Sequence, residues 1–243
     1  IQALQASQLN QLTTVQMGIL LTTQVAALKF LQISSLSTGN LNALTETQFQ
    51  SLTTNQIGSL KPIQIANLET TDLQALSSTQ LQAVTIHGIS ALRTDEIVAL
   101  TTKQVASLTQ SQIAVLTSTQ LGALESQDLK VLSVSALTGL QLNYLSTSQI
   151  SDLLTTQVRA LLGSQISSLS TSNLNALTST QFQALTTTQV SSLKTQQISS
   201  IETADLQALN TTQIQAISRD SIGLLSTQAI NALSTDKLAA LTL

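Results

Sequence analysis

Residues 44–60 read Leu44-Thr-Glu-Thr-Gln-Phe-Gln-Ser-Leu52-Thr-Thr-Asn-Gln-Ile-Gly-Ser-Leu60, and they contain the eight-residue unit that builds the 243-residue chain. Leucine closes each octad, a second apolar residue precedes it by three positions, and glutamine usually comes directly before that residue. The consensus is (Ser/Thr)-(Ser/Thr)-x-Gln-(Ile/Leu/Val)-x-(Ala/Ser)-Leu. A period of this kind indicates a repeat protein in which each unit is stabilised by its neighbours.

The octads run through the chain with a single slip. The closing leucine recurs every eight residues from Leu4 to Leu132 and again from Leu137 to Leu241, so the one step between the two series is five residues long. Other apolar residues take this place only at Val84, Ile201 and Ile217. Residues 1–110 also align with residues 134–243 at a constant offset of 133. We therefore predict two blocks, residues 1–133 and an incomplete second block 134–243, in one continuous solenoid.

Neither a continuous helix nor a continuous strand can carry this period. At ~100° per residue, eight helical residues turn ~800°, so the apolar stripe would drift around the helix. In an extended chain the apolar positions, separated by three and five residues, would point to opposite faces. The chain must therefore change direction about once in every octad.

Polar residues mark where each helix begins. Ser or Thr followed three residues later by Gln, as in Thr45-Glu-Thr-Gln48, is a capping box, in which each side chain bonds the other residue's backbone N–H. Pro62 follows Lys61, which stands in the N-cap place, so the proline falls at N1, where a helix tolerates it. Acidic residues fall in the first turn, where the helix dipole favours them, at Asp72, Asp95, Glu96, Asp128 and Asp205.

These signals predict an all-α solenoid with one capped helix of about seven residues per octad. Such a helix is too short to be stable alone and must stack on its neighbours. We expect two octads, about 16 residues, in each coil of the solenoid. The alternative is a β-solenoid, because Thr and Val favour strands, but the caps and the abundance of Ala, Gln and Leu favour helices.

Composition narrows the class of protein. Hydrophobic residues make up 42% of the chain, which is enough for a core, whereas charged residues make up only 9% and the net charge is −3. Thinly spread cations exclude nucleic acid as a partner, and the apolar runs are too short to span a membrane. The chain has no cysteine, so disulfides and thiolate metal sites are excluded.

No residue of the sequence is predicted to be catalytic, to bind a cofactor or to bind a metal. We therefore expect no cofactor and no enzymatic activity. His87, the only histidine, lies near Arg93, Asp95 and Glu96 without a second His, and we interpret it as a surface position. We expect the aromatic residues to fill the core: Phe30, Phe49, Phe182 and Tyr144. Apolar residues at nominally polar octad positions are interpreted as extra core, with exposed patches as the alternative: Leu21, Phe30, Ile63, Ile86, Leu154 and Leu162.

The tracts Leu100–Leu108 and Leu185–Leu193, both built on Leu-Thr-Thr-x-Gln-Val, resemble octad arrays of very large secreted or surface-attached bacterial proteins of the adhesin type. This resemblance covers the whole chain and implies an extracellular or cell-surface protein. We expect a structural role, as a stalk or as a subunit that stacks end to end into a homo-oligomer or head-to-tail polymer. The alternative is a binding module whose repetitive Thr/Gln face recognises a glycan, a surface or another copy of the chain.

Overall fold

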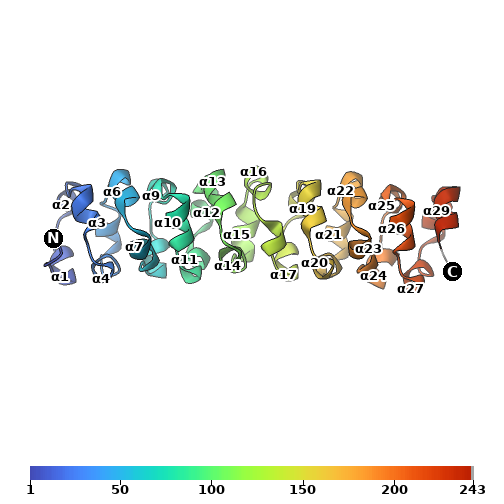
Figure 1. Cartoon of the computed structure of the whole chain (residues 1–243), viewed down its shortest axis with the longest axis horizontal. Coiled ribbons are helices and arrows are strands. Elements are labelled where there is room, and N and C mark those ends of the chain that lie inside the picture. The colour runs from blue at the N-terminus through green and yellow to red at the C-terminus, as the bar shows by residue number, and fades with distance from the viewer. Residues whose placement is uncertain (242–243) are drawn as a thin grey trace. The chain divides into compact units, whose positions relative to one another are not determined.

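The computed structural model describes residues 1–241, and in this range it contains 29 short α-helices, one 3-10 helix and no strand. The predicted helical solenoid is confirmed, and the β-solenoid alternative is wrong (Figure 1). The described chain divides into two compact units, one from Ile1 to Leu132 and the other beginning at Ser133. The 3-10 helix η1 (Val134–Ala136) occupies the five-residue step of the sequence.

The helices of the first unit are α1 (Ala6–Leu9), α2 (Thr14–Gly18), α3 (Thr22–Ala26), α4 (Phe30–Ile33), α5 (Thr38–Leu41), α6 (Glu46–Ser51), α7 (Thr54–Gly58), α8 (Pro62–Ile65), α9 (Thr70–Ala75), α10 (Ser78–Ala83), α11 (Ile86–Ala91), α12 (Thr94–Ala99), α13 (Thr102–Ser107), α14 (Gln110–Ile113), α15 (Ser118–Ala123) and α16 (Ser126–Leu129). The α-helices of the second unit are α17 (Gly139–Leu142), α18 (Thr147–Ser151), α19 (Thr155–Ala160), α20 (Gly163–Ser168), α21 (Thr171–Asn175), α22 (Ser179–Ala184), α23 (Thr187–Ser191), α24 (Thr195–Ser199), α25 (Thr203–Ala208), α26 (Thr211–Gln215), α27 (Arg219–Ile222), α28 (Thr227–Asn231) and α29 (Thr235–Ala240).

Each α-helix has four to six residues, fewer than the seven expected, because the end of each octad is used to turn the chain. After α6 the closing Leu52 is already extended, with φ −63° and ψ 135°, and the next N-cap, Thr53, is extended as well. No described residue has a positive φ. These corners therefore need no left-handed glycine, unlike many helix ends, which explains how a chain with only 8 glycines makes so many turns.

The predicted capping boxes are present. In α6 the Thr45 hydroxyl accepts from the Gln48 N–H at 3.3 Å, and Gln48 Oε1 accepts from the Thr45 N–H at 2.7 Å. Lys61 is the N-cap of α8 and Pro62 is its N1 residue, as predicted. Where the N-cap has no hydroxyl, as at Lys61, the N–H of the glutamine bonds the N-cap carbonyl instead, at 2.9 Å. In α8 the other half of the capping box is retained without a hydroxyl, because Gln64 Oε1 still accepts from the Lys61 N–H at 2.9 Å.

A hydroxyl N-cap should contribute measurably to stability. Replacing Thr53 with alanine removes the acceptor for the Gln56 N–H and is expected to lower the free energy of unfolding by about 1 kcal/mol. The loss should not be larger, because the Gln56 N–H can turn to the N-cap carbonyl. Urea denaturation of Thr53→Ala beside Thr54→Ala, an exposed N1 position, measures the difference. Equal stability of the two variants would contradict the capping role.

Helices stack on every third helix of the chain, in each unit separately. In the first unit α3, α6, α9, α12 and α15 form one column, and α7, α10 and α13 belong to a second. In the second unit α19, α22 and α25 stack in the same manner. One coil therefore contains three octads. The expected coil of two octads is wrong.

The core is built from two side chains per octad. In α6 they are Phe49, at the fourth helical position (N4), and the closing Leu52, and both are buried. Phe49 and Phe182 fill the core as predicted, whereas Phe30 and Tyr144 are 54% and 39% exposed, so that prediction is wrong for them. Phe30 stands at N1, on the outer face of its helix, where no second layer of the fold covers it.

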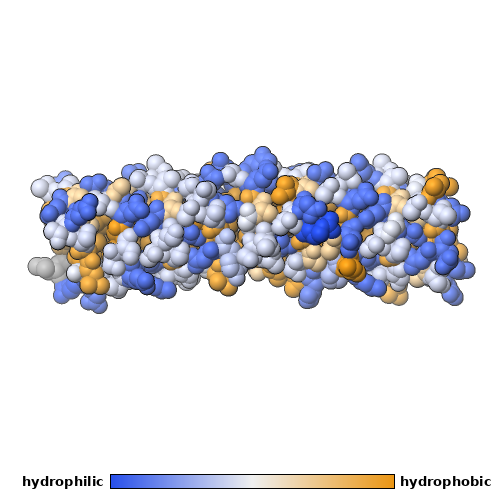
Figure 2. All heavy atoms as spheres, turned by 180° about the vertical axis from the view of Figure 1, so that it is seen from behind, coloured by the Kyte–Doolittle hydropathy of each residue, from blue (hydrophilic) through white to orange (hydrophobic). Residues whose placement is uncertain are grey.

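The interpretation of misplaced apolar residues as extra core is also wrong. All of them are exposed, by 41% to 63%: Leu21, Phe30, Ile63, Ile86, Leu154 and Leu162. They lie at the N-cap, N1 or N2 position, and these positions face outward in this fold. On the face drawn in Figure 2, apolar residues form scattered spots in a surface that is mostly polar or near neutral.

Candidate functional site

The glutamine at the third helical position (N3) joins one coil to the next. In α13, Gln104 is buried, and its Oε1 accepts from the Thr101 N–H at 2.9 Å, which caps its own helix. Its Nε2 donates to the carbonyls of Leu73 and Leu76, 31 and 28 residues earlier, at 2.8 and 2.9 Å. One side chain therefore satisfies three backbone groups that the ends of two helices leave without a partner.

The same bonds recur in both units, and we call this set of N3 side chains the glutamine ladder. In every member Nε2 donates to carbonyls at the end of the fourth helix before its own. Its members in the first unit include Gln48, Gln56, Gln64, Gln80, Gln104, Gln112 and Gln120, and in the second Gln165, Gln181, Gln189, Gln197 and Gln213. Sequence reasoning predicted the capping half of this role and missed the bond between coils. The signal was the preference for Gln, since Glu serves equally well in a capping box but cannot donate.

The ladder gives a stack of coils two different ends. On α1, α2 and α3, Gln8, Gln16 and Gln24 cap their own helices, but no fourth helix precedes them in the described chain. These three side chains are exposed. Among the described helices, no N3 side chain lies in register to bond the carbonyls of Ile214 on α26 and of Ile217, which closes the same octad. Within each unit the amide donors therefore point toward the preceding coil and the carbonyl acceptors toward the following one.

Four helices carry an acidic residue at N3 instead of glutamine: Asp72 on α9, Glu96 on α12, Asp128 on α16 and Asp205 on α25. All four stand in the first turn, as predicted, but they are buried, which the dipole argument did not anticipate. Asp72 Oδ2, Asp128 Oδ1 and Asp205 Oδ2 are buried without a hydrogen-bond partner.

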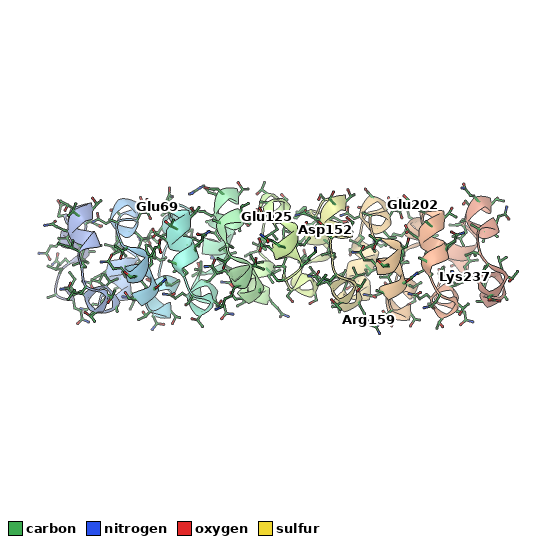
Figure 3. All side chains as sticks on the ribbon, turned by 90° about the horizontal axis from the view of Figure 1, so that it is seen from above. Glu69, Glu125, Asp152, Arg159, Glu202 and Lys237 are labelled. Carbon is green, nitrogen blue, oxygen red and sulfur yellow. The ribbon has the colours of Figure 1, made fainter. Side chains whose placement is uncertain are left out.

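Burial perturbs two of these carboxyl groups strongly. Burial, with the charges of Glu69 and Glu46, raises the pKa of Asp72 to about 7. Burial, with the charge of Glu202, raises the pKa of Asp205 to about 6. Glu69 and Glu202 are the exposed N-caps of the two helices, and Figure 3 shows them at the periphery of their units. A buried carboxylate next to a second acid is costly, so both aspartates bind a proton more tightly than an exposed aspartate does.

The buried negative charge of Glu96 is compensated by the guanidinium group of Arg93. Its Oε2 accepts from the Arg93 N–H at 2.7 Å, and its Oε1 lies 3.2 Å from Arg93 Nη1. Arg93 also donates to the Asp95 carboxylate and to the Ala66 carbonyl of the preceding coil. Burial raises the pKa of Glu96 against these interactions, while the hydrogen bond from Arg93 lowers the pKa of the exposed Asp95.

His87 and the apolar surface residues lie outside the glutamine ladder. His87 lies exposed on α11, and the described residues contain no group of three His, Cys, Asp or Glu side chains placed to hold a metal ion. A surface groove in the first unit is lined by Phe30 and Leu31 of α4, Thr54 and Gly58 of α7 and Ala83 of α10, and no titratable side chain lines it. None of the described helices has the length and apolar character needed to cross a membrane.

Comparison with known proteins supports the repeat array. The ALTTAQ repeat family matches three stretches, residues 65–102, 89–126 and 198–227, which together cover less than half of the chain. The first two matches begin three octads apart, at positions 65 and 89, and this spacing is the length of one coil. No curated protein matches the chain. The chain is therefore a helical repeat protein that is similar to ALTTAQ repeats over these stretches.

Proposed function

We propose that this chain is an extracellular structural repeat protein whose copies stack end to end. The observation that supports this proposal is the direction of the hydrogen bonds in the glutamine ladder. Gln8, Gln16 and Gln24 present amide donors at one end, and the carbonyls at the ends of α27 to α29 are the matching acceptors at the other. No catalytic role forms part of the proposal, because the ladder binds backbone groups and holds no reacting atom.

The geometry within each unit supports one arrangement of two copies. Inside a unit an N3 side chain bonds the end of the fourth helix before its own, as Gln104 of α13 bonds α9. If the octad that closes at Leu4 of a second copy follows α29, Gln8 lies in register with the carbonyls of Ile222 and Leu225 at the end of α27. Gln16 and Gln24 then reach the ends of α28 and α29 in the same way. The contact joins two different surfaces, so it leaves a free end after each addition and builds an open polymer.

Apolar burial would add to these hydrogen bonds. The closing leucines are buried inside each unit, whereas Leu12 and Leu20 at the first coil are only half-buried. Ile222 and Leu225 near the other end are half-buried as well. Stacking covers both sets, and burial of apolar area is the main favourable term in association. The extracellular or cell-surface location that we propose rests on composition. The chain is rich in Ser, Thr and Gln, has few charged residues and has no cysteine.

Sedimentation velocity and electron microscopy of the purified chain over a range of concentrations test the proposal. We expect filaments whose length increases with protein concentration. A triple variant, Gln8→Glu, Gln16→Glu and Gln24→Glu, keeps the oxygen that caps each helix but removes the donor, and it should stay monomeric. The control changes three exposed glutamines in the same way, Gln50, Gln110 and Gln196. Monomers at every concentration of the unaltered chain would contradict end-to-end stacking.

A further inference from the structure

Asp72 and Asp205 occupy the same place in the two units. They stand at N3 of α9 and α25, and 205 − 72 equals the 133-residue offset of the sequence duplication. Asp72 is 4% exposed and Asp205 is 5% exposed. In each of them Oδ2 is buried and has no hydrogen-bond partner. A buried polar atom without a partner is rare and needs a physical explanation.

The rest of the ladder identifies what this oxygen faces. By the register of the other N3 side chains, the facing carbonyls are those of Leu41 and Leu44 for Asp72 and those of Leu174 and Leu177 for Asp205. Asparagine, which has the length of aspartate, reaches these acceptors from N3. Asn173 Nδ2 donates to the carbonyls of Leu142 and Leu145, both at 3.1 Å, and Asn40 Nδ2 donates to the carbonyl of Leu9 at 3.0 Å.

An ionised aspartate in this place would oppose the carbonyls. A carboxylate has only acceptor oxygens, so oxygen would face oxygen in a buried setting, whereas a neutral carboxyl has one O–H that can donate. The acid is therefore equivalent to asparagine or glutamine only when it carries a proton.

The surrounding charges do not stabilise the ionised form. Around Asp205 the nearest acid is the N-cap Glu202, α22 and α28 carry no titratable side chain, and Lys237 of α29 donates to the Gln207 carbonyl at the other end of α25. Around Asp72 the neighbours are Glu69 on its own helix, Glu46 on α6, and Arg93, Asp95 and Glu96 on α12. Arg93 is engaged with Asp95 and Glu96. Among the described residues, neither aspartate forms an ion pair with a cation.

We propose that Asp72 and Asp205 are proton-operated joints between coils: each neutral carboxyl donates its O–H to a carbonyl of the preceding coil, and each joint loosens when the carboxyl ionises. The proton comes from solvent and returns to it, and no other reactant is needed. This inference concerns single chains and does not depend on end-to-end stacking.

The direction of the pH dependence follows from the pKa values. An unfolded aspartate has a pKa of about 3.9, whereas burial raises the pKa of Asp205 to about 6 and that of Asp72 to about 7. The folded state therefore binds protons more tightly, so stability falls as pH rises through this window. The contribution of each joint is fully present below about pH 4 and is lost once the pH exceeds the raised pKa.

Thermal unfolding of dilute protein between pH 4.5 and 8 tests the proposal. The unaltered chain should lose stability as the pH rises from 4.5 to 8. Asp205→Asn should raise the unfolding midpoint at pH 8 by about 3 °C and change it little at pH 4.5, and Asp72→Asn should do the same. The reciprocal variant Asn173→Asp should lower the midpoint at pH 8 and recover it at pH 4.5. The exposed Asp220→Asn is the matched control, with no change at either pH.

Two results would overturn the proposal. The carboxyl carbon resonance of Asp205 should titrate near pH 6, and a midpoint near pH 4, with an Asn variant no more stable at pH 8, rules the joint out. Calcium chloride added at pH 8 should leave the midpoint unchanged. A rise that occurs in the unaltered chain and is lost in Asp205→Asn would mean that a cation, and not a proton, bridges the carboxylate and the carbonyls.

Discussion

Replacing Gln104 with leucine is expected to lower the free energy of unfolding by about 3 kcal/mol, although the two side chains are similar in size. The substitution removes the acceptor for the Thr101 N–H and both hydrogen bonds to the carbonyls of Leu73 and Leu76. Each buried backbone group left without a partner costs about 1–3 kcal/mol, and the added apolar burial offsets part of this loss. The net effect is large because one side chain serves two helix ends.

Urea denaturation gives the total change, and amide hydrogen exchange locates it. Stability in a repeat array is a sum over neighbouring units, so exchange should speed up most in α9 and α13, the helices that Gln104 joins. The matched control is Gln110→Leu, at an exposed N1 position of the next helix, which should change stability by less than about 0.5 kcal/mol. Similar losses for Gln104→Leu and Gln110→Leu would show that the ladder contributes little.

Replacing Phe49 with alanine should cost about 4 kcal/mol, because a fully buried ring is lost and a cavity is left behind. Phe49 lies at N4 of α6, in a column where the neighbouring α3 carries the smaller Val25. In the second unit Phe182 of α22 stacks on α19, which carries Val158. In both columns a large N4 side chain lies next to a small one in the neighbouring coil, so that the two together fill the space between the helices. Phe49→Leu should therefore cost only about 1 kcal/mol.

The same urea measurement on Phe30→Ala is the control, because Phe30 is exposed on the outer face of α4. That variant should lose less than about 0.5 kcal/mol. The comparison separates the burial of an aromatic ring from its presence in the octad. Comparable losses at Phe30 and Phe49 would contradict the assignment of N4 as the core position.

How far the sequence predicts the candidate site depends on the position within the octad. The capping role of Gln104 follows from local spacing, since Thr101 and Gln104 are three residues apart. The bonds to Leu73 and Leu76 join distant parts of the chain, and only knowledge of the number of octads in a coil shows that these groups meet. The burial of Asp72 and Asp205 could not be predicted for the same reason, because it also depends on the number of octads in a coil. The helix dipole correctly predicts that both aspartates lie in the first turn of their helices. The sequence of so short a helix does not show which of its sides faces the preceding coil.

The sequence by itself determined the octad, the start of each capped helix and the two side chains of each octad that are buried. These features depend on backbone groups and apolar residues within one octad of each other, so local spacing contains them. Tertiary structure decided that three octads make a coil, that N3 faces the neighbouring coil and that Phe30 and Leu21 remain exposed. These features depend on the angle at which consecutive helices turn, and that angle is set by packing between residues three octads apart, a separation that the octad pattern does not specify.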